Sequence, residues 1–569
     1  MNHTASITGI PTIQVSAETL YEVETDDGAT SWRWLCSPLR VLAMTRGADG
    51  KGWGRLVEVE DSDGGRHRWA VPAELFAGDG AEVRREFLRL GLRLSTAPGA
   101  RARFSDLLQQ WAPAARATTA DRLGWADASC AAFITGSGRV IGDADVVFQS
   151  EHAPGAAAEM RPAGTSEEWR EAVGAACVGN PMMTLAVSLA FTGALFEPLQ
   201  AEGGGLHLRG QSSRGKSTVL RAAVSVWGSP RFLQSWRATS NGLEGTAAAC
   251  NGSLIALDEM GEINAREAGG TAYMLANGQG KARAGRSGVA RPAARWRTAI
   301  LSSGEISLAD KMAEAGQRSR AGQEVRLLDI QADGQAFGAF DNLHGHDAPA
   351  AFAEHVSRLS ATSYGTAGPE FVERLVSDLD GALGNIRKAA EAFSASANRA
   401  LTLPDEGQTR RALGRFALIA AAGEMATAWG LTGWPKGEAS RAALAALRLW
   451  IDGRGGVGPA EDREAVARTR AFIAAHGSAR FDRLDDDGSA PRVANRAGWR
   501  DGESFFVAAD TWSREIHAGA DPAQAARAVR AAGFLVADAG ERLQTKAPRA
   551  AGRARCYCIR AEIMGSGDD

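Results

Sequence analysis

Cysteine, lysine and net charge are all scarce in this chain. Its 569 residues include six cysteines, and only seven of its 64 basic residues are lysine. No two cysteines are spaced as C-x-x-C, and only Cys556 and Cys558 are close in sequence. So sparse a set excludes a disulfide scaffold and a cysteine zinc module, and it fits a reducing cytoplasm. The formal net charge of −3 excludes a uniformly basic nucleic-acid coat, although it allows local basic surfaces.

The chain also lacks a long uninterrupted apolar run. Its most apolar stretch, PMMTLAVSLAFTGALFEPL at 181–199, is diluted by Thr184, Ser188 and Thr192. It is shorter than the ~20 apolar residues that a membrane span needs, so we expect a buried helix. The N-terminus shows no basic segment followed by an apolar core, so we expect no export signal and a cytoplasmic location.

Length and composition predict a multidomain α/β protein. At about 150 residues per domain, 569 residues suggest three or four domains. Short alternating strands with Asp-Gly and Gly-Gly turns predict antiparallel hairpins near the N-terminus, with helices near 79–92 and 104–111. From a capping box at Thr165, apolar strands alternate with helices, as in a mainly parallel sheet. The predicted domains are a β-rich N-terminal domain (1–165), an α/β core (166–338), an alanine-rich helical, lid-like domain (339–455) and a C-terminal domain (456–569).

A phosphate-binding loop is the clearest motif. The segment LHLRGQSSRGKSTVL contains G-x-x-x-x-G-K-S, entered by a strand and left by a helix with apolar spacing. Its glycines let backbone N–H groups and the helix N-terminus face phosphates. Lys216 would reach the β- and γ-phosphates, and Ser217 would hold Mg²⁺. The predicted nucleotide-binding residues are Gly210, Ser213, Gly215, Lys216, Ser217 and Thr218.

The scarcity of lysine strengthens this prediction. In a chain that strongly prefers arginine, Lys216 stands where a compact ammonium suits phosphates and a wide guanidinium does not. The predicted cofactors are therefore ATP and Mg²⁺.

An acidic pair follows at the spacing of a Walker B motif. The apolar run at 254–257 reads as a buried parallel strand and ends in Asp258 and Glu259. Asp258 would coordinate Mg²⁺, and Glu259 would polarise the attacking water.

A later strand and an arginine-rich loop complete the predicted ATPase site. The segment RWRTAILSSGE would place Ser302 or Ser303 near the γ-phosphate if its strand lies between the two motif strands. Beyond it, Arg318, Arg320 and Arg326 precede or enter a final core strand. One of them could act as an arginine finger towards a neighbouring subunit, with Arg320 the first choice and Arg326 the second. A solvated basic loop is the alternative.

A basic segment lies between the acidic pair and the serine strand. Residues 277–297 alternate glycines with basic residues, without an acid, after a helix predicted at 264–276. A concentrated positive hairpin is a candidate contact to a nucleic-acid backbone, whereas a solvated loop is the plainer interpretation. We expect Lys281 and Arg283 at its tip. The other basic residues are Arg286, Arg291, Arg295 and Arg297.

The C-terminal segment predicts a winged-helix-like domain. Two helices, at 461–477 and after the Asp521 cap, precede strands at 534–537 and 541–544, a basic loop and a last strand. The wing would carry Lys546, Arg549, Arg553 and Arg555 for DNA contact, and a protein-docking domain is the alternative. Cys556 and Cys558 are expected to be packing residues, because two cysteines cannot complete a zinc site.

Together these motifs resemble a large bacterial family of unknown function found on phages, plasmids and chromosome cassettes, which includes staphylococcal cassette helicases related to MCM. The resemblance runs from about Tyr21 to Ile330, and more loosely to the end. The stretches that carry it are WLCSPLRVLAMTR, LHLRGQSSRGKST, VWGSP, SWRATSNGLEG, LIALDEMGE, YMLANGQGKARA, ILSSGE and AGQEVRLLDI.

The resemblance implies an AAA+ core of the pre-sensor-1 hairpin type in a hexameric, ATP-driven DNA translocase. It implies that Asp258 and Glu259 form Walker B, that Lys281 and Arg283 belong to a pore hairpin, and that Ser303 is the sensor. The chain departs from MCM-like proteins, whose sensor is typically Asn. Arg411 or Arg415 would be a second sensor, unless they only lie on a helix surface.

The leading hypothesis is a ring-forming helicase that replicates a mobile element and acts on single-stranded or forked DNA. A primase–helicase is a second possibility, with Asp143 and Asp145 as its one acidic pair in the N-terminal domain. A third is an ATP-dependent switch or loader that does not unwind DNA. A primase or a single-strand-binding protein is a possible partner.

Overall fold

The computed structural model describes most of the chain. The described residues are 13–15, 18–24, 29–149, 155–284, 290–291, 293–317, 321–404, 406–454, 460–484, 493, 495–538 and 542–565. They fall into two compact units. Unit 1 comprises Met1–Ser319, Arg326–Ala395 and Arg415–Ala446, and unit 2 comprises Arg320–Val325, Ser396–Gly414 and Leu447–Asp569. Within these described residues, no helix combines the length and the apolar character that a membrane span requires.

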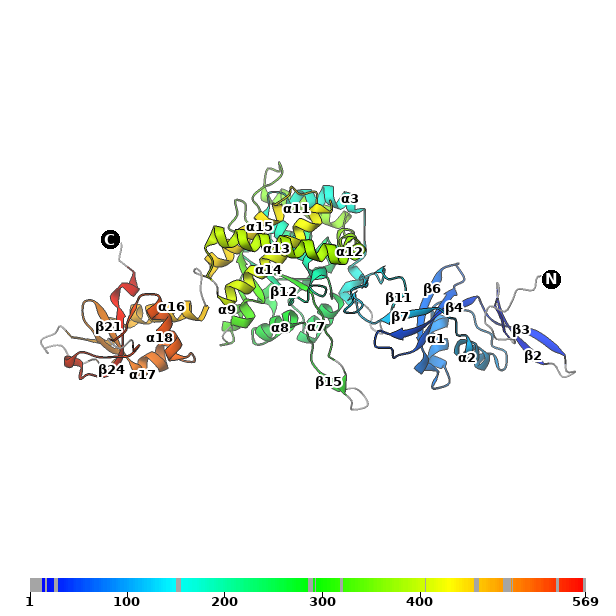
Figure 1. Ribbon diagram of the computed structural model, residues 1–569, viewed down its shortest axis with the longest axis horizontal. Coiled ribbons are helices and arrows are strands. Elements are labelled where there is room, and N and C mark those ends of the chain that lie inside the picture. The colour runs from blue at the N-terminus through cyan, green and yellow to red at the C-terminus, as the bar shows by residue number, and fades with distance from the viewer. Residues whose placement is uncertain are drawn as a thin grey trace. The chain divides into compact units, whose positions relative to one another are not determined.

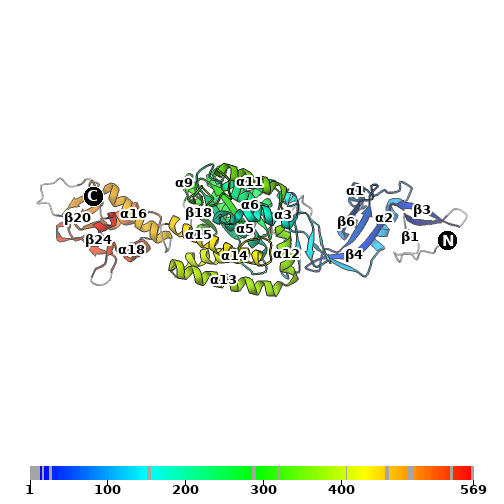
Figure 2. The ribbon, with the colours of Figure 1, turned by 90° about the horizontal axis from the view of Figure 1, so that it is seen from above.

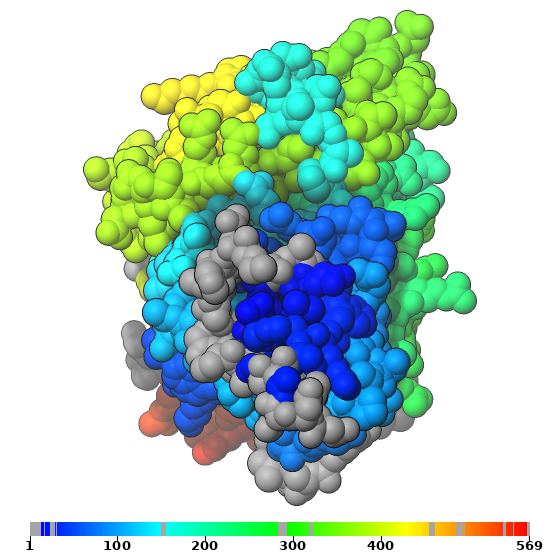
Figure 3. Space-filling model, turned by 90° about the vertical axis from the view of Figure 1, so that its right-hand side faces the viewer, coloured from blue at the N-terminus to red at the C-terminus, as the bar shows by residue number. Residues whose placement is uncertain are grey.

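The N-terminal part of unit 1 holds two β-sheets, of order β1-β2-β3 and β11-β7-β4-β5-β6. The first sheet is dark blue in the space-filling view (Figure 3). Two helices accompany the second sheet, α1 (Ala81–Arg89) and α2 (Ala100–Gln110). The strands are β1 (Ile13–Val15), β2 (Thr19–Glu24), β3 (Thr30–Cys36), β4 (Leu39–Gly47), β5 (Gly54–Glu60), β6 (Arg66–Pro72), β7 (Arg116–Ala120) and β11 (Val146–Phe148).

The expected N-terminal hairpins are confirmed only in part. Strands β4, β5 and β6 pair antiparallel, and both helices lie close to where the sequence predicts them. Strands β7 and β11 were not predicted and do not belong to hairpins, because β7 pairs parallel with β4 and β11 parallel with β7. The chain between β6 and β7 passes through α1 and α2, whose Phe87 and Phe104 rings meet at 5.7 Å in the core. This helical crossover is what lets β7 run in the same direction as β4.

A small sheet fixes residues 121–149 to the α/β core. It has the order β10-β9-β8, from β8 (Gly124–Trp125), β9 (Ala132–Ile134) and β10 (Val140–Gly142). The indole N–H of Trp125 donates to the carbonyl of Ala194 at 2.8 Å. The Phe133 ring stacks on Trp227 with centroids 5.9 Å apart. A buried hydrogen bond and a ring stack therefore join this sheet to the core.

The core begins at the predicted capping box. The Thr165 side chain accepts from the Glu168 N–H, and the Glu168 carboxylate accepts from the Thr165 N–H. Helices α3 (Ser166–Trp169) and α4 (Ala175–Cys177) lead to α5 (Pro181–Thr192). Residues 182–192 of α5 are all buried, which confirms the expected buried helix. Its three hydroxyls donate to backbone carbonyls of the preceding turn or loop, so their burial leaves no donor unpaired.

A five-stranded, fully parallel sheet forms the centre of unit 1, in the order β13-β14-β17-β12-β18. Its strands are β12 (Gly204–Arg209), β13 (Gln234–Ser235), β14 (Leu254–Asp258), β17 (Ala299–Gly304) and β18 (Leu327–Gln331). The serine strand β17 therefore lies between the P-loop strand β12 and the acidic strand β14, which meets the condition set for Ser302 or Ser303. Since the carboxyl ends of parallel strands share one edge of a sheet, the motifs that end these three strands meet there.

Helices surround this sheet. In Figure 2, α5 lies beside α6 (Lys216–Val224) in the middle of the core. The other helices of unit 1 before the helical region are α7 (Ser240–Ala249), α8 (Ala265–Asn277) and α9 (Leu308–Ala313). Helix α10 (Ala321–Glu324) belongs to unit 2. Figure 1 shows a hairpin of β15 (Arg283–Ala284) and β16 (Ala290–Arg291) extending away from the core on the side of α7 and α8.

The alanine-rich region is helical, as the sequence predicts. Its helices are α11 (Pro349–Thr362), α12 (Ala367–Ser377), α13 (Leu379–Leu401), α14 (Gly407–Ala428) and α15 (Glu438–Gly453). Helix α11 packs on α6, the helix that follows the P-loop. This contact places the start of the helical region close to the phosphate-binding motif.

The C-terminal part of unit 2 packs two predicted helices, α16 (Ala460–His476) and α18 (Pro522–Ala531), on a sheet of order β19-β20-β21-β24-β22. Asp521 caps α18 as expected, accepting from the Ala523 N–H. The predicted strand at 541–544 is wrong, because the strand lies at β23, where it pairs with β24. The sheet strands are β19 (Phe481–Arg483), β20 (Gly498–Arg500), β21 (Ser504–Ala508), β22 (Leu535–Val536), β23 (Thr545–Lys546) and β24 (Arg555–Arg560), and a short helix, α17 (Ala509–Thr511), follows β21.

Candidate functional site

The P-loop joins β12 to α6 through a tight turn. Gly215 caps α6 with φ at 92°, a left-handed conformation that residues with a Cβ seldom adopt. A Cβ there would also lie 2.6 Å from the ring of Phe340. Because Gly215 has no side chain to cap the helix, the first N–H groups of α6 are not satisfied by a capping side chain. The glycine of the motif is thus required by both backbone conformation and packing.

The ammonium of Lys216 is buried inside this loop. Its Nζ donates to the carbonyl of Gly210 at 2.8 Å and to that of Gln211 at 2.6 Å. The residue is 5% exposed. Lys216 therefore stabilises the loop with two charge-assisted hydrogen bonds, and its positive charge lies inside the turn of the motif.

A second loop, which follows β18, hydrogen-bonds to the P-loop. The sequence did not predict this contact. The Asp333 carboxylate accepts from the Gln211 N–H at 2.7 Å and from the Gln331 side chain. Burial opposes ionisation, but these hydrogen bonds outweigh it, so the pKa of Asp333 is lowered. A Cβ at Gly210 would lie 2.6 Å from the Asp333 carboxyl carbon, so the first motif glycine also makes room for this support. An Asp-Gly pair directly after an apolar strand was the available sequence signal.

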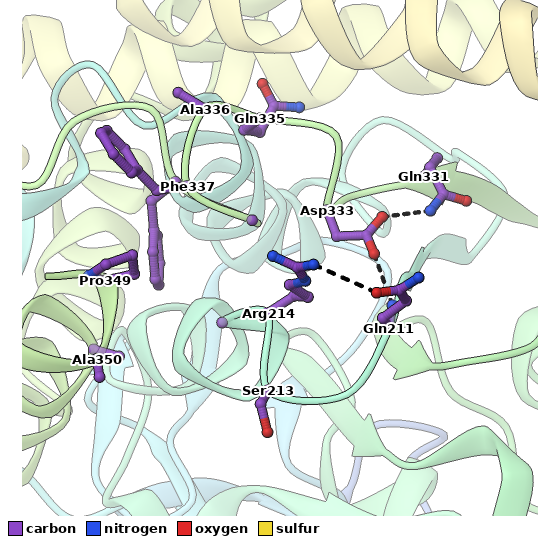
Figure 4. A pocket seen from close by; sticks show the side chains of 14 residues that line it. Gln211, Ser213, Arg214, Gln331, Asp333, Gln335, Ala336, Phe337, Pro349 and Ala350 are labelled. Carbon is purple, nitrogen blue, oxygen red and sulfur yellow. Dashed lines mark hydrogen bonds between the residues drawn. The ribbon is translucent and has the colours of Figure 1, made fainter.

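A cavity of about 630 Å³ opens between the P-loop and this second loop. Figure 4 shows Arg214 between Asp333 and Gln211 on one side and Phe337 on the other. The Phe337 side chain is 43% exposed. Pro349 and Ala350 of α11 line the apolar end. The cavity therefore offers an aromatic face and a polar end directly beside the phosphate-binding motif.

The acidic pair and Ser303 meet at the carboxyl edge of the sheet. The Ser303 hydroxyl donates to the Asp258 carboxylate, which also accepts from the Glu259 N–H at 3.1 Å. Burial, followed by the charge of Asp258, raises the pKa of Glu259, and Lys216 opposes this shift. Of the two candidate serines, Ser303 is the one that contacts the acidic pair.

Ser302 belongs to a separate buried chain of hydrogen bonds. The Trp236 indole N–H donates to the Ser302 oxygen at 2.8 Å, and His207 Nδ1 lies 2.8 Å from the same oxygen. His207 Nε2 lies 2.9 Å from the Ile306 carbonyl, which can only accept, so Nε2 carries the proton and Nδ1 accepts from Ser302. Burial lowers the pKa of His207, consistent with a neutral ring. This chain joins β12 and β17 to the residue after β13.

The two serines should therefore respond differently to substitution. Ser302→Ala leaves the Trp236 N–H and His207 Nδ1 without partners, so we expect a loss of about 1–3 kcal/mol in the free energy of unfolding. Ser303→Ala should cost less stability, because it leaves this buried chain intact and removes only the hydroxyl donor of the Asp258 carboxylate. Thermal melting measures both effects. Equal melting temperatures for the two variants would contradict the assignment of Ser302 to the buried chain and of Ser303 to Asp258.

The arginine candidates have different environments. Arg318 and Arg320 lie outside the described residues. Arg326 directly precedes β18, and its guanidinium lies over the Tyr273 ring, 4.8 Å from the centroid. Arg411, in unit 2, is exposed and donates to the Gly407 carbonyl.

Arg415 contradicts both predicted roles. Its Nη2 donates to the Gly203 carbonyl at 3.2 Å, at the amino end of β12, whereas the P-loop follows the carboxyl end. The residue is half-buried, and burial lowers its pKa to about 10. Arg415 is therefore neither a second sensor at the P-loop nor a residue of an exposed helix surface.

The basic segment forms the predicted hairpin, with two corrections. Arg283 pairs with Arg291, and Lys281 precedes β15, so both lie on the stem and not at the tip. Arg297 is held by Glu197 at 3.1 Å and by the Phe196 and Ala201 carbonyls, so it anchors the hairpin. Lys281 and Arg295 are exposed. Arg286 lies outside the described residues.

The four basic residues of the predicted wing lie on one hairpin of unit 2. Lys546 pairs with Arg555 between β23 and β24, and Arg549 and Arg553 lie in the connecting turn. All four are exposed. Cys556 and Cys558 are buried and free, as expected of packing residues.

The acidic pair of the N-terminal part lies at the surface. The Asp143 carboxylate accepts from the Asp145 N–H at 2.9 Å, and both residues are exposed. Throughout the described part of the chain, no three His, Cys, Asp or Glu side chains cluster as metal ligands would.

The comparisons with known proteins agree with this architecture. Residues 14–295 match the family model DUF927, described as a domain of unknown function. No curated protein matches the chain. Of 26 matching chains of solved structure, one is described as "SCCmec type IV Cch - active helicase". It is 18% identical, with a TM-score of 0.69, over 99% of this chain and 100% of that chain. The chain therefore shares its multidomain α/β fold over essentially its whole length.

Proposed function

We propose that this protein is an ATP-driven DNA helicase of a mobile genetic element. The observation that carries the proposal is the meeting of the P-loop, Asp258, Glu259 and Ser303 at one edge of one parallel sheet. The fold shared with a protein described as an active helicase supports it. DNA-stimulated ATP hydrolysis and fork unwinding by the purified protein test it directly.

The strand order supports an AAA+ core of the pre-sensor-1 hairpin type. Starting from the edge strand β18, the P-loop strand β12 comes second, then β17, β14 and β13. A β-hairpin is inserted between the helix that follows the acidic strand and the serine strand. These features agree with the resemblance to cassette helicases related to MCM.

The residues present fit a nucleotide and Mg²⁺. The Lys216 ammonium hydrogen-bonds to loop carbonyls, which phosphate oxygens would replace as acceptors. The Gly210, Ser213, Gly215 and Thr218 backbone would follow the phosphates. The Ser217 hydroxyl and the Asp258 carboxylate are oxygen ligands of the kind Mg²⁺ prefers, and the ion would neutralise charge on the β- and γ-phosphates. The cavity beside Phe337 would receive the ribose and base.

In this proposal Glu259 acts as general base. Its carboxylate would accept the proton of the attacking water while Ser303 keeps Asp258 oriented. A neighbouring subunit would complete the site with Arg320 or Arg326, which requires a homo-oligomer, and the resemblance implies a hexamer.

The DNA contacts in this proposal are the basic segment that contains β15 and β16 and the β23–β24 hairpin. Lys281, Arg283, Arg286, Lys546, Arg549 and Arg553 would bind phosphates of single-stranded or forked DNA. In a ring, a hairpin inserted at the position of β15–β16 would project into the channel.

The hairpin contact leads to a specific prediction. Lys281→Ala combined with Arg283→Ala should remove most of the DNA stimulation of ATPase activity and lower DNA affinity about tenfold at low salt, because two phosphate contacts are lost. Arg387→Ala combined with Lys388→Ala is the matched control, since both residues are exposed on α13. DNA-stimulated ATPase and fluorescence anisotropy measure the effects. Unchanged DNA binding and unwinding would contradict the pore-hairpin assignment.

A DNA-bound ATPase switch or loader is the main alternative function. It predicts ATP-dependent DNA loading and normal hydrolysis without fork unwinding. A primase–helicase is less supported, because Asp143 and Asp145 are not joined by a third ligand in the described residues. A primer-synthesis assay tests the primase–helicase hypothesis.

A further inference from the structure

Lysine is so rare in this chain that the surroundings of each one are informative. Five of the seven lysines are exposed, and the two buried ones are Lys216 and Lys311. Lys216 belongs to the P-loop, whereas Lys311 belongs to none of the motifs described above. A buried ammonium is costly unless it is hydrogen-bonded or paired. The partners of Lys311 therefore indicate what its charge contributes.

Lys311 lies on α9, the short helix that follows the serine strand β17. A capping box of Ser307 and Asp310 begins this helix. The Lys311 Nζ donates to the Gly261 carbonyl at 2.8 Å and to the Glu314 carboxylate at 2.8 Å. Gly261 lies in a 3₁₀ turn, η6 (Met260–Glu262), which begins directly after Glu259. The ammonium thus connects the helix after the serine strand to the turn after the acidic pair.

The backbone of Glu259 needs external support. Its φ of 59° and ψ of 66° are left-handed, a strained conformation for a residue with a Cβ. Such a conformation persists only where the surrounding structure enforces it, and it is found at functional sites. The turn that follows is held from outside at two points. Ser235 donates to the Glu262 carboxylate at 2.7 Å, and Lys311 holds the Gly261 carbonyl.

We propose that Lys311 is a positioning residue that keeps Glu259 in its left-handed conformation by holding the Gly261 carbonyl. The inference rests on the proposed role of Glu259 as general base. Lys311 does not touch the reacting atoms. It acts through the turn, because a shift of η6 would move the Glu259 backbone and carboxylate away from the position where a water could be activated.

Charge-assisted hydrogen bonds explain why a lysine suits this position. A single ammonium can donate to a carbonyl and a carboxylate in different directions from one compact centre. A guanidinium is planar and wider, so Lys311→Arg would keep the charge but displace the turn. The simpler alternative is that Lys311 only stabilises α9 through its ion pair with Glu314 three residues later.

Two single substitutions in the full-length protein separate these roles. Lys311→Ala removes both contacts, whereas Glu314→Ala removes only the ion pair and leaves the Gly261 contact. We expect Lys311→Ala to lower kcat about tenfold to a hundredfold with KM for ATP changed less than about twofold. Glu314→Ala should match the wild type in both constants. Lys311→Gln, whose amide can still donate to a carbonyl, should recover part of kcat.

Hydrogen exchange measured by mass spectrometry provides a readout that does not depend on activity. Faster exchange at 259–263 is expected in Lys311→Ala and not in Glu314→Ala. Equal kcat, or equal exchange, in these two variants would overturn the proposal. If the wild-type protein hydrolysed no ATP, the proposed function would fail, and the exchange comparison would still decide whether Lys311 holds the turn.

Discussion

Replacing Glu259 with Gln should lower kcat of ATP hydrolysis by about 10³-fold while ATP binding is kept. The amide has nearly the same shape as the carboxylate but cannot accept a proton from water. The Glu259 N–H would still donate to Asp258, so the turn and the P-loop should stay intact. Steady-state kinetics and nucleotide titration of the same preparation measure the two effects.

The raised pKa of Glu259 adds a pH dependence to this prediction. Burial, then the Asp258 charge, disfavours the ionised form, so protonation begins at a higher pH than for an ordinary glutamate. Since only the ionised form can act as the base, kcat should fall on the acid side at a correspondingly higher pH. If Glu259→Gln retained more than about a tenth of the wild-type kcat, Glu259 would be ruled out as general base.

Replacing Lys216 with Ala should weaken ATP binding about a hundredfold, which is the second largest effect expected. The substitution removes a buried cation directed into the loop and leaves the Gly210 and Gln211 carbonyls without their donor. Titration with a fluorescent nucleotide measures the loss. Lys436→Ala is the control, because Lys436 is exposed.

Thermal melting separates loss of binding from loss of structure in this variant. The Lys216→Ala core should melt within a few degrees of the wild type, because a loss of about 1–2 kcal/mol shifts the melting temperature of a large domain only slightly. Wild-type nucleotide affinity in a folded variant would contradict the assignment of the P-loop.

Local patterns along the chain made much of the core predictable. The P-loop lies between β12 and α6, Asp258 ends β14, and the Thr165 capping box begins α3. Each of these depends on neighbouring residues, such as a glycine at a tight turn or an apolar run that ends in acids. The position of β17 between β14 and β12 was only a condition of the sequence argument, and it brings Ser303 to Asp258.

The supporting contacts of the site were not predictable, because their partners are far apart in sequence. Asp333 reaches the P-loop across 122 residues, and His207 reaches Ser302 across 95. No periodicity or spacing rule connects such pairs. For the same reason the contact of Arg415 could not be predicted, since its partner is the Gly203 carbonyl at the amino end of β12.

The short C-terminal strands illustrate a second limit. β19 and β20 have three residues each, too few for an alternating pattern to stand out. They become strands through pairing with each other and with β21. Lys311 shows a third limit. Its sequence context is that of an ordinary helix, and only the contact with the Gly261 carbonyl indicates its proposed role.

The burial of all six cysteines has a practical chemical consequence. Burial raises the pKa of Cys36 to about 12 and that of Cys130 to about 11, so both stay protonated thiols at neutral pH. The thiolate is the nucleophile that attacks thiol reagents such as maleimides, and buried thiols are inert. A cysteine introduced at exposed Lys281 would therefore be the first to react with maleimides. The native chain is thus suited to site-specific dyes and cross-linkers without prior removal of its own thiols.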